Sequence, residues 1–74
     1  MAREVRIREH KIRLGQLLKL SGVVDSGSDV KALLATAPPT VNGEPETRRG
    51  RQLHDGDVVV VEGEELVVSV DQRG

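Results

Sequence analysis

The chain has 74 residues, which suits one small domain with a modest hydrophobic core. It contains no cysteine and no phenylalanine, tyrosine or tryptophan, so disulfides, thiolate metal sites and an aromatic core are excluded. Lysine and arginine number 11 and aspartate and glutamate 12, so the net charge of −1 does not by itself indicate an anionic partner. We expect a single domain over residues 1–74 with an aliphatic core.

The first predicted elements are a strand and a helix. Residues 4–8 (EVRIR) alternate apolar and charged side chains, the period of a half-buried strand. Residues 12–22 (IRLGQLLKLSG) give a helix one apolar stripe, with leucines at i, i+3 and i+4: Leu14, Leu17 and Leu18. Gly22 is placed to end this helix in a left-handed cap. Arg13 and Lys19 lie on the opposite face, away from the leucines.

A second helix is predicted between Ser26 and Pro38. Ser26 can cap the free backbone N–H groups, and Asp29 three positions later completes the pattern of a capping box. Apolar side chains then follow at i, i+3, i+4 and i+7: Val30, Leu33, Leu34 and Ala37. The helix must stop at Pro38-Pro39, because proline has no N–H and the residue before it avoids helical geometry. The two helices are expected to pack stripe against stripe.

After the two prolines the sequence has the period of strands. Asn42-Gly43 is a tight-turn signal between two short extended segments. Further on, residues 58–61 and 66–70 indicate two valine-rich strands joined by a turn at 62–65 (EGEE). The predicted fold class is α+β, in the order β-α-α-β-β-β, with two short packed helices on a small twisted, mostly antiparallel sheet. The residues expected between helices and sheet are Leu17, Leu33 and Leu34.

No arrangement of residues in the sequence indicates catalysis. His10 and His54 have no cysteine to work with, and no nucleophile lies at the spacing of a base. The acidic residues at 55–57 and 62–65 are explained as turns rather than as metal ligands. No phosphate-binding loop and no dinucleotide fingerprint is present. We therefore expect a protein that is not an enzyme, with no cofactor, no metal and no small-molecule substrate.

The basic residues are concentrated in the first two thirds of the chain. Residues 1–51 hold ten basic and six acidic side chains, a balance of +4. Residues 52–74 hold one basic and six acidic side chains, a balance of −5. Such an asymmetry indicates an anionic partner at one end of the molecule, although solvated charged faces are the alternative explanation.

The strongest functional signal is the arginine triplet within residues 48–51 (RRGR). The planar guanidinium of arginine suits phosphate oxygens, and Gly50 allows either close approach of a ligand or a positive φ. Because no aromatic side chain is present to stack on bases, a phosphate-binding patch favours a double-helical target recognised by its shape. The alternative is a solvated loop whose charge Glu44 and Glu46 neutralise.

These residues also resemble a known family. The stretch LGQLLKLSGVVDSGSDVKALL…VNGEPETRRGRQLHDGDVV is similar to the S-four RNA-binding domain, named after the fourth small-subunit ribosomal protein, and above all to its stand-alone bacterial members. The resemblance covers a motif core at residues 12–61, in which VNG (41–43) and GD (56–57) match the turns of the family. It implies an α-L motif, in which two helices and the following loop form a positive surface for structured RNA.

Carried over position by position, the resemblance implies six RNA-binding residues: Arg13, Lys19, Lys31, Arg48, Arg49 and Arg51. The chain departs from the family at Ala37, Pro39 and Thr40, where a glycine, an apolar strand residue and often a basic residue are usual. It departs again at Gln52, where a lysine is common. These departures imply a shortened first core strand and a weaker grip on RNA than in typical relatives.

Two functions from different classes remain. The first is non-enzymatic binding of structured RNA through a phosphate-binding patch. The RNA in this case is ribosomal RNA, free or within a ribosomal subunit. The second is a protein–protein adaptor that uses the exposed edge of the valine-rich hairpin or its acidic tip at 62–65. Convergence of the six basic residues on one face favours RNA, and their dispersal favours the adaptor. Because no 18-residue apolar run and no signal-peptide core is present, we expect a soluble, cytoplasmic monomer without membrane contact.

Overall fold

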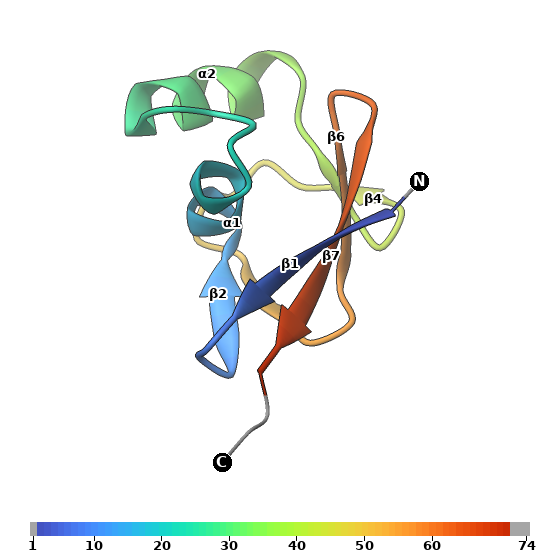
Figure 1. Cartoon of the computed structure of the whole chain (residues 1–74). Helices are drawn as coiled ribbons and strands as arrows, with labels where there is room; N and C mark the ends of the chain where they lie inside the picture. The colour runs from blue at the N-terminus through green and yellow to red at the C-terminus, as the bar shows by residue number, and fades with distance from the viewer. Residues whose placement is uncertain (1, 72–74) are drawn as a thin grey trace.

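The computed structural model describes residues 2–71, in which two helices and seven strands form an α+β fold (Figure 1). In chain order the elements are β1 (Ala2–Ile7), β2 (Lys11–Arg13), α1 (Leu14–Leu20), α2 (Gly27–Thr36), β3 (Thr40–Val41), β4 (Glu44–Pro45), β5 (Gln52–His54), β6 (Val58–Val61) and β7 (Glu64–Val70). The predicted fold class and element order are confirmed, and β2, β4 and β5 are additional short strands. Met1 and residues 72–74 of the predicted domain lie outside the described residues.

The main sheet has five strands in the order β1-β7-β6-β3-β4. Strands β6 and β7 form the predicted valine-rich hairpin, and β1 adds to β7 in parallel, with Val5 opposite Val68. The other pairs of this sheet are antiparallel. Both strands of the hairpin therefore lie inside the sheet. The exposed hairpin edge that the adaptor interpretation invoked is wrong, because β1 and β3 cover it.

Two tight turns shape the sheet. Glu62 and Gly63 take positive φ of 48° and 79°, as in a two-residue type I′ turn, so the hairpin turn is shorter than the predicted segment 62–65. Asn42 and Gly43 form the predicted turn between β3 and β4, with φ of 51° and 90°. Asparagine and glycine both tolerate this left-handed backbone, which explains why this pair marks the turn in the sequence.

A polar link joins this Asn-Gly turn to the start of β6. Asn42 accepts a hydrogen bond from the N–H of Val58 at 2.9 Å and donates one to Asp57 at 3.2 Å. Asp57 in turn accepts from the N–H of His54 at 2.7 Å, across a turn in which Gly56 has a φ of 88°. These bonds fix the end of β5 and the beginning of β6. The two sequence turns that resemble the family are therefore joined in the structure.

Helix α1 begins two residues later than predicted. Ile12 and Arg13 belong to β2, which pairs antiparallel with β5, so Ile12 lies opposite Leu53. The backbone of Arg13 is extended, and its N–H donates to the side chain of Gln16 at 3.1 Å. At the other end Gly22 takes the predicted left-handed conformation, with a φ of 84°. The leucine spacing predicts the helix, but it does not predict that Ile12 and Arg13 pair with β5 and so are excluded from the helix.

Helix α2 has the predicted start and end. The hydroxyl of Ser26 accepts a hydrogen bond from the N–H of Asp29 at 3.3 Å, which caps the helix. The helix ends at Thr36, before the two prolines. Ala37 is exposed and lies after the helix with a φ of −145°, so its predicted place in the apolar stripe is wrong. Strand β3 beyond it is only two residues long, and the preceding Pro39 is fully buried.

The core is wholly aliphatic and lies between the two helices and one face of the sheet (Figure 1). The predicted core residues are buried: Leu17, Leu33 and Leu34. Leu53 of β5 and Leu66 of β7 are also fully buried, so both sheets contribute to one cluster. This packing holds α1, α2 and the segment before β5 in fixed relative positions.

Candidate nucleic-acid interface

The loop at residues 46–51, here called the arginine loop, is organised by one buried carboxylate. The side chain of Glu46 is 9% exposed and accepts hydrogen bonds from the backbone N–H of Arg48 at 3.0 Å and from its Nε and Nη2 at 3.2 Å. Nη1 of Arg51 donates to the same carboxylate at 3.0 Å. The N–H of Glu46 donates to the carbonyl of Pro39 at 2.9 Å. The loop therefore has a defined conformation rather than being freely solvated.

These hydrogen bonds shift the ionisation of both partners. The side-chain and backbone bonds from Arg48, followed by the bond from Arg51, lower the pKa of Glu46 from 4.5 to about 2. The hydrogen bond with Glu46 also raises the pKa of Arg48 above its ordinary value. Glu46 is therefore ionised near neutral pH, and its negative charge compensates part of the positive charge of the two arginines.

The arginine loop also docks on the start of α1. The N–H of Leu14 donates to the carbonyl of Arg51 at 2.8 Å, and the N–H of Gly15 donates to the carbonyl of Arg49 at 2.9 Å. N–H groups in the first turn have no partner within a helix, so these carbonyls satisfy them. A Cβ on Gly15 would lie 3.5 Å from the Cβ of Arg49, which shows how closely the two backbones approach. The docking places Arg49 beside α1.

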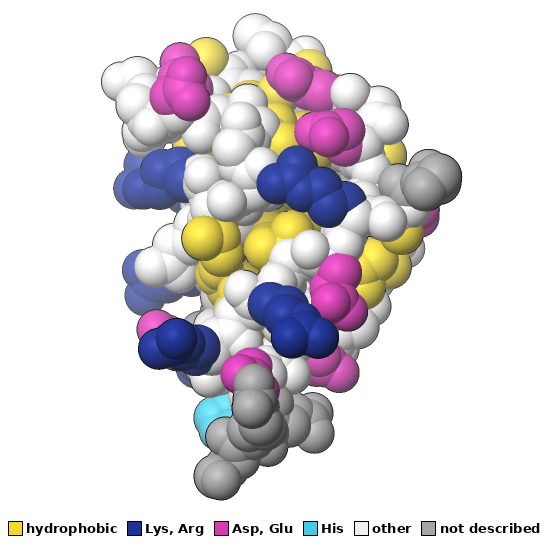
Figure 2. Space-filling view, viewed as in Figure 1, with side chains coloured by type: hydrophobic (Ala, Val, Ile, Leu, Met, Phe, Trp, Pro, Cys, Tyr) yellow, Lys and Arg dark blue, Asp and Glu magenta, His cyan; other side chains and the backbone are white. Residues whose placement is uncertain are grey.

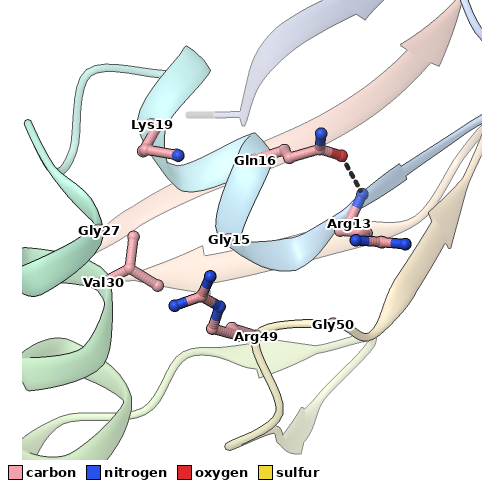
Figure 3. Close-up of a pocket in the computed structure, with 8 residues that line it drawn as sticks. All are labelled: Arg13, Gly15, Gln16, Lys19, Gly27, Val30, Arg49 and Gly50. Carbon is pink, nitrogen blue, oxygen red and sulfur yellow. Dashed lines mark hydrogen bonds between the residues drawn. The ribbon is translucent and has the colours of Figure 1, made fainter.

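A polar pocket lies between α1, α2 and the arginine loop (Figure 3). Its lining residues are Arg13, Gly15, Gln16, Lys19, Gly27, Val30, Arg49 and Gly50. In Figure 3 the side chain of Arg49 extends from the loop toward α1 and Val30 of α2. The three cations come from three different elements, and none of the lining residues is acidic. The lining of this pocket therefore carries a net positive charge.

The other three predicted basic residues lie outside this pocket. Lys31 of α2 shares a shallower depression with Arg49. Arg48 and Arg51 are paired with Glu46, and their side chains remain 74% and 38% exposed. The six residues thus divide into three that share the pocket, one that adjoins it through Arg49, and two that build the loop.

For Gly50 the sequence suggested either a positive φ or close approach of a ligand to the backbone. It does not take a positive φ, so that expectation is wrong. The space where a Cβ would project is open, and the residue lines the pocket beside Arg49. A hydrogen bond from the N–H of Arg51 to the carbonyl of Arg48, at 3.2 Å, closes the turn that contains it. Gly50 therefore leaves room for a ligand to approach the backbone.

Figure 2 shows one face of the molecule, on which basic and acidic side chains are interspersed. Basic side chains lie along the side that carries α1 and β2 and also near the middle of the face, and acidic side chains lie near the end that carries the β6–β7 turn and also lower down. The acidic residues of that turn are exposed: Glu62, Glu64 and Glu65. The charge asymmetry of the sequence is therefore clearest at the exposed glutamates of this turn and does not divide the face in Figure 2 into two separate patches.

Sequence reasoning underestimated two residues of the site. Glu46 entered only in the alternative interpretation, as one of two residues that neutralise a solvated loop, whereas it is buried and fixes the positions of two arginines. Gln16 was assigned no role, yet its side chain accepts a hydrogen bond from the backbone N–H of Arg13 and lines the pocket. The spacing ETRRGR, with a glutamate two and five residues before two arginines, was the available signal for Glu46. Its burial could not be inferred, because a glutamate in the same local sequence can be either exposed or buried.

Residues 2–71 contain neither a cluster of metal-binding side chains nor a membrane-spanning helix. No group of histidine, aspartate and glutamate side chains in this range is placed to hold a metal ion. No helix in the same range is long and apolar enough to cross a membrane.

The fold and the pocket define a small α+β protein that presents a docked arginine loop beside two short helices. The sequence model of the S4 domain, written S-four above, matches residues 5–69, and the chain belongs to this family. The chain is 48% identical over 63 residues to the "Probable ribosome maturation protein RlbA" of Bacillus subtilis (strain 168), a match that covers 85% of this chain and 89% of that relative. The resemblance drawn from the sequence is confirmed, and together the family and this relative indicate an RNA-binding, ribosome-related role.

Proposed function

We propose that the chain binds structured RNA without catalysing a reaction on it, by holding phosphates in the pocket between α1, α2 and the arginine loop. The observation that carries this proposal is the convergence of Arg13, Lys19 and Arg49 on a pocket without an acidic lining residue. None of the three forms an ion pair within residues 2–71. Their attraction for an anion is therefore not compensated inside the protein.

The remaining three predicted residues add phosphate contacts around the pocket. Lys31 adjoins Arg49 and would contact a neighbouring phosphate as a point charge. Arg48 and Arg51 direct part of their guanidinium donors to Glu46, but each guanidinium carries five N–H groups, so donors remain for a ligand. Arg13, Lys19 and Arg49 are thus the central contacts, and Lys31, Arg48 and Arg51 the flanking ones.

The proposed target is ribosomal RNA with helical structure. The word ribosome in the name of the B. subtilis relative supports the choice of ribosomal RNA. The absence of aromatic residues from the sequence supports a double-helical target, because unpaired bases cannot stack on a ring here. Phosphates held in the fixed geometry of a duplex match cations held in a fixed geometry by the loop and helices.

Salt dependence tests the proposal. If about three to five of the six cations reach phosphates at once, log K for a stem-loop falls with log[salt] at a slope of about −3 to −4.5. The measurement is a fluorescence-anisotropy titration of the full chain against a stem-loop and a polypyrimidine strand of equal length, from low to physiological salt. The stem-loop is expected to bind more tightly than the strand.

Two results would contradict this function. A slope near zero would mean that phosphates are not neutralised in the complex. A clear preference for the polypyrimidine strand would mean that the shape of a duplex is not recognised. Either result would favour the protein adaptor, now restricted to the acidic tip at 62–65 because the hairpin edge is covered.

A further inference from the structure

A second group of basic residues lies outside the six predicted contacts. Arg6 at the end of β1, and Arg8 and Lys11 in and after the following turn, line a groove together with Ile12, Gln16 and Leu20. We call this the N-terminal groove. Its cations precede the motif core at residues 12–61, so the resemblance assigned them no role. Glu9 is the acidic residue in its lining, which leaves an excess of positive charge.

The N-terminal groove is continuous with the basic pocket along the exposed face of α1. Gln16 lines both of them. Between them lies a third depression, lined by Lys11, Arg13 and Gln16 among others. Figure 3 shows Arg13 and Gln16 side by side at the edge of the pocket, joined by their hydrogen bond. A ligand held at Arg49 and Arg13 therefore lies next to a depression that contains Lys11 and Glu9, and this depression shares Lys11 and Gln16 with the N-terminal groove.

The two ends of this surface differ in chemistry. At the groove end Leu20 is 57% exposed, and Ile12 is partly buried beside it. Leu20 lies one helical turn after Gln16 on the same face of α1. An RNA duplex presents phosphates and sugars outward, so it offers little to an exposed leucine. An unpaired nucleotide exposes the apolar faces of its base together with its phosphate, which suits a leucine flanked by cations.

We propose that the N-terminal groove binds an unpaired nucleotide that flanks the RNA helix held in the basic pocket. Arg8 and Lys11 receive its phosphate, and Leu20 and Ile12 contact the face of its base. Arg6 contributes less, because its Nε is paired with Glu4 at 3.2 Å. The proposal rests on the proposed function and adds to it a ligand class, a helix with a single-stranded extension.

The test compares a blunt stem-loop with the same stem-loop carrying a short unpaired extension, placed at the 5′ end in one probe and at the 3′ end in another. For the wild-type chain, one extension should raise affinity about fourfold at physiological salt for each additional phosphate neutralised. It should also steepen the salt slope by about 0.7 per phosphate. The measurement is anisotropy at several salt concentrations.

Paired variants separate the cationic part of the groove from the apolar part. Arg8→Gln should remove the extra salt slope, whereas Arg3→Gln, which removes a cation of the preceding strand β1 outside the groove, should keep it. Leu20→Ala should reduce the gain from the extension about twofold with an unchanged slope. Val60→Ala is its control, because Val60 is the other exposed large hydrophobic residue and lies on the sheet, away from the groove. Thermal unfolding of each variant verifies the fold.

The possible results separate the two proposals. If the blunt stem-loop binds but neither extension adds affinity, or if both groove variants keep the full gain, the groove does not hold the extension and the inference is overturned. If the blunt stem-loop itself fails to bind, the proposed function and the inference that rests on it are both overturned. Loss of the gain in the groove variants alone supports the inference.

Discussion

The arginine loop and the β6–β7 turn are both short, charged and glycine-containing, yet they are built differently. The arginine loop contains a buried counter-charge, Glu46, and its carbonyls accept hydrogen bonds from N–H groups in the first turn of α1. The acidic turn has three exposed glutamates. One of them, Glu64, forms a long ion pair, with its Oε1 3.8 Å from Nη1 of Arg3. A charged loop that contains a buried counter-charge and is hydrogen-bonded through its backbone to a helix can hold its cations in place. A charged turn without these features remains solvated.

The first prediction concerns α1, the helix on which the arginine loop docks, and tests whether this helix packs into the core as described. Leu17 is fully buried in α1, so Leu17→Ala should lower the free energy of unfolding by about 2–5 kcal/mol. Leu20→Ala, in the same helix but exposed, should change it by less than about 0.5 kcal/mol. Urea denaturation followed by circular dichroism measures both. Equal effects would mean that α1 does not pack as described.

The second prediction compares the two charged regions directly. Replacing Arg48, Arg49 and Arg51 together by glutamine should weaken stem-loop binding about twentyfold at physiological salt, about fivefold from Arg49 and about twofold from each arginine that is paired with Glu46. The matched variant replaces Glu62, Glu64 and Glu65 by glutamine. It should bind at least as tightly as the wild-type chain. Unchanged affinity of the arginine variant would leave the loop as solvated surface.

The third prediction distinguishes arginines within the loop. Arg49 lines the pocket without an ion pair in the described chain, whereas Arg51 is paired with Glu46. Arg49→Gln should therefore reduce stem-loop affinity about fivefold and flatten the salt slope by about 0.9, as expected for one phosphate. Arg51→Gln should reduce affinity about twofold at most. A larger effect at Arg51 would contradict the division of roles proposed here.

The fourth and smallest effect concerns acid stability. The pKa of Glu46 is lowered to about 2 in the folded chain from its ordinary 4.5, so its contribution is fully present above pH 4.5. It is lost progressively as the pH falls from 4.5 toward 2, because the unfolded chain takes up the proton first. Unfolding in urea at several pH values in this range should therefore show a smaller acid-induced loss of stability in Glu46→Gln than in the wild-type chain.

A control at the acidic turn accompanies this pH series. Glu62 is exposed and forms no ion pair within residues 2–71, so Glu62→Gln should retain the acid dependence of the wild-type chain. If Glu46→Gln also retained it, the hydrogen bonds from Arg48 and Arg51 would not be stabilising the ionised carboxylate in solution.

Much of the fold could be predicted because its signals are local. The leucine spacing of α1, the serine cap and proline stop of α2, and the Asn-Gly turn each depend on a few neighbouring residues. The predicted basic residues were likewise visible as residue types. Which of them share a pocket was not, because Arg13, Lys19 and Arg49 are separated along the chain and meet only when the loop docks on α1.

The sequence by itself determined the fold class, the family and the order of the main elements, since periodicity, caps and turn residues act over a few positions. Only the tertiary structure decided the pairing of β2 with β5, the covering of the hairpin edge by β1, and the burial of Glu46. Each of these is a contact between segments distant in sequence, whose free energy depends on surface buried by the whole fold rather than on local residue preference. For the same reason the division of the arginines between Glu46 and the open pocket became visible only in three dimensions.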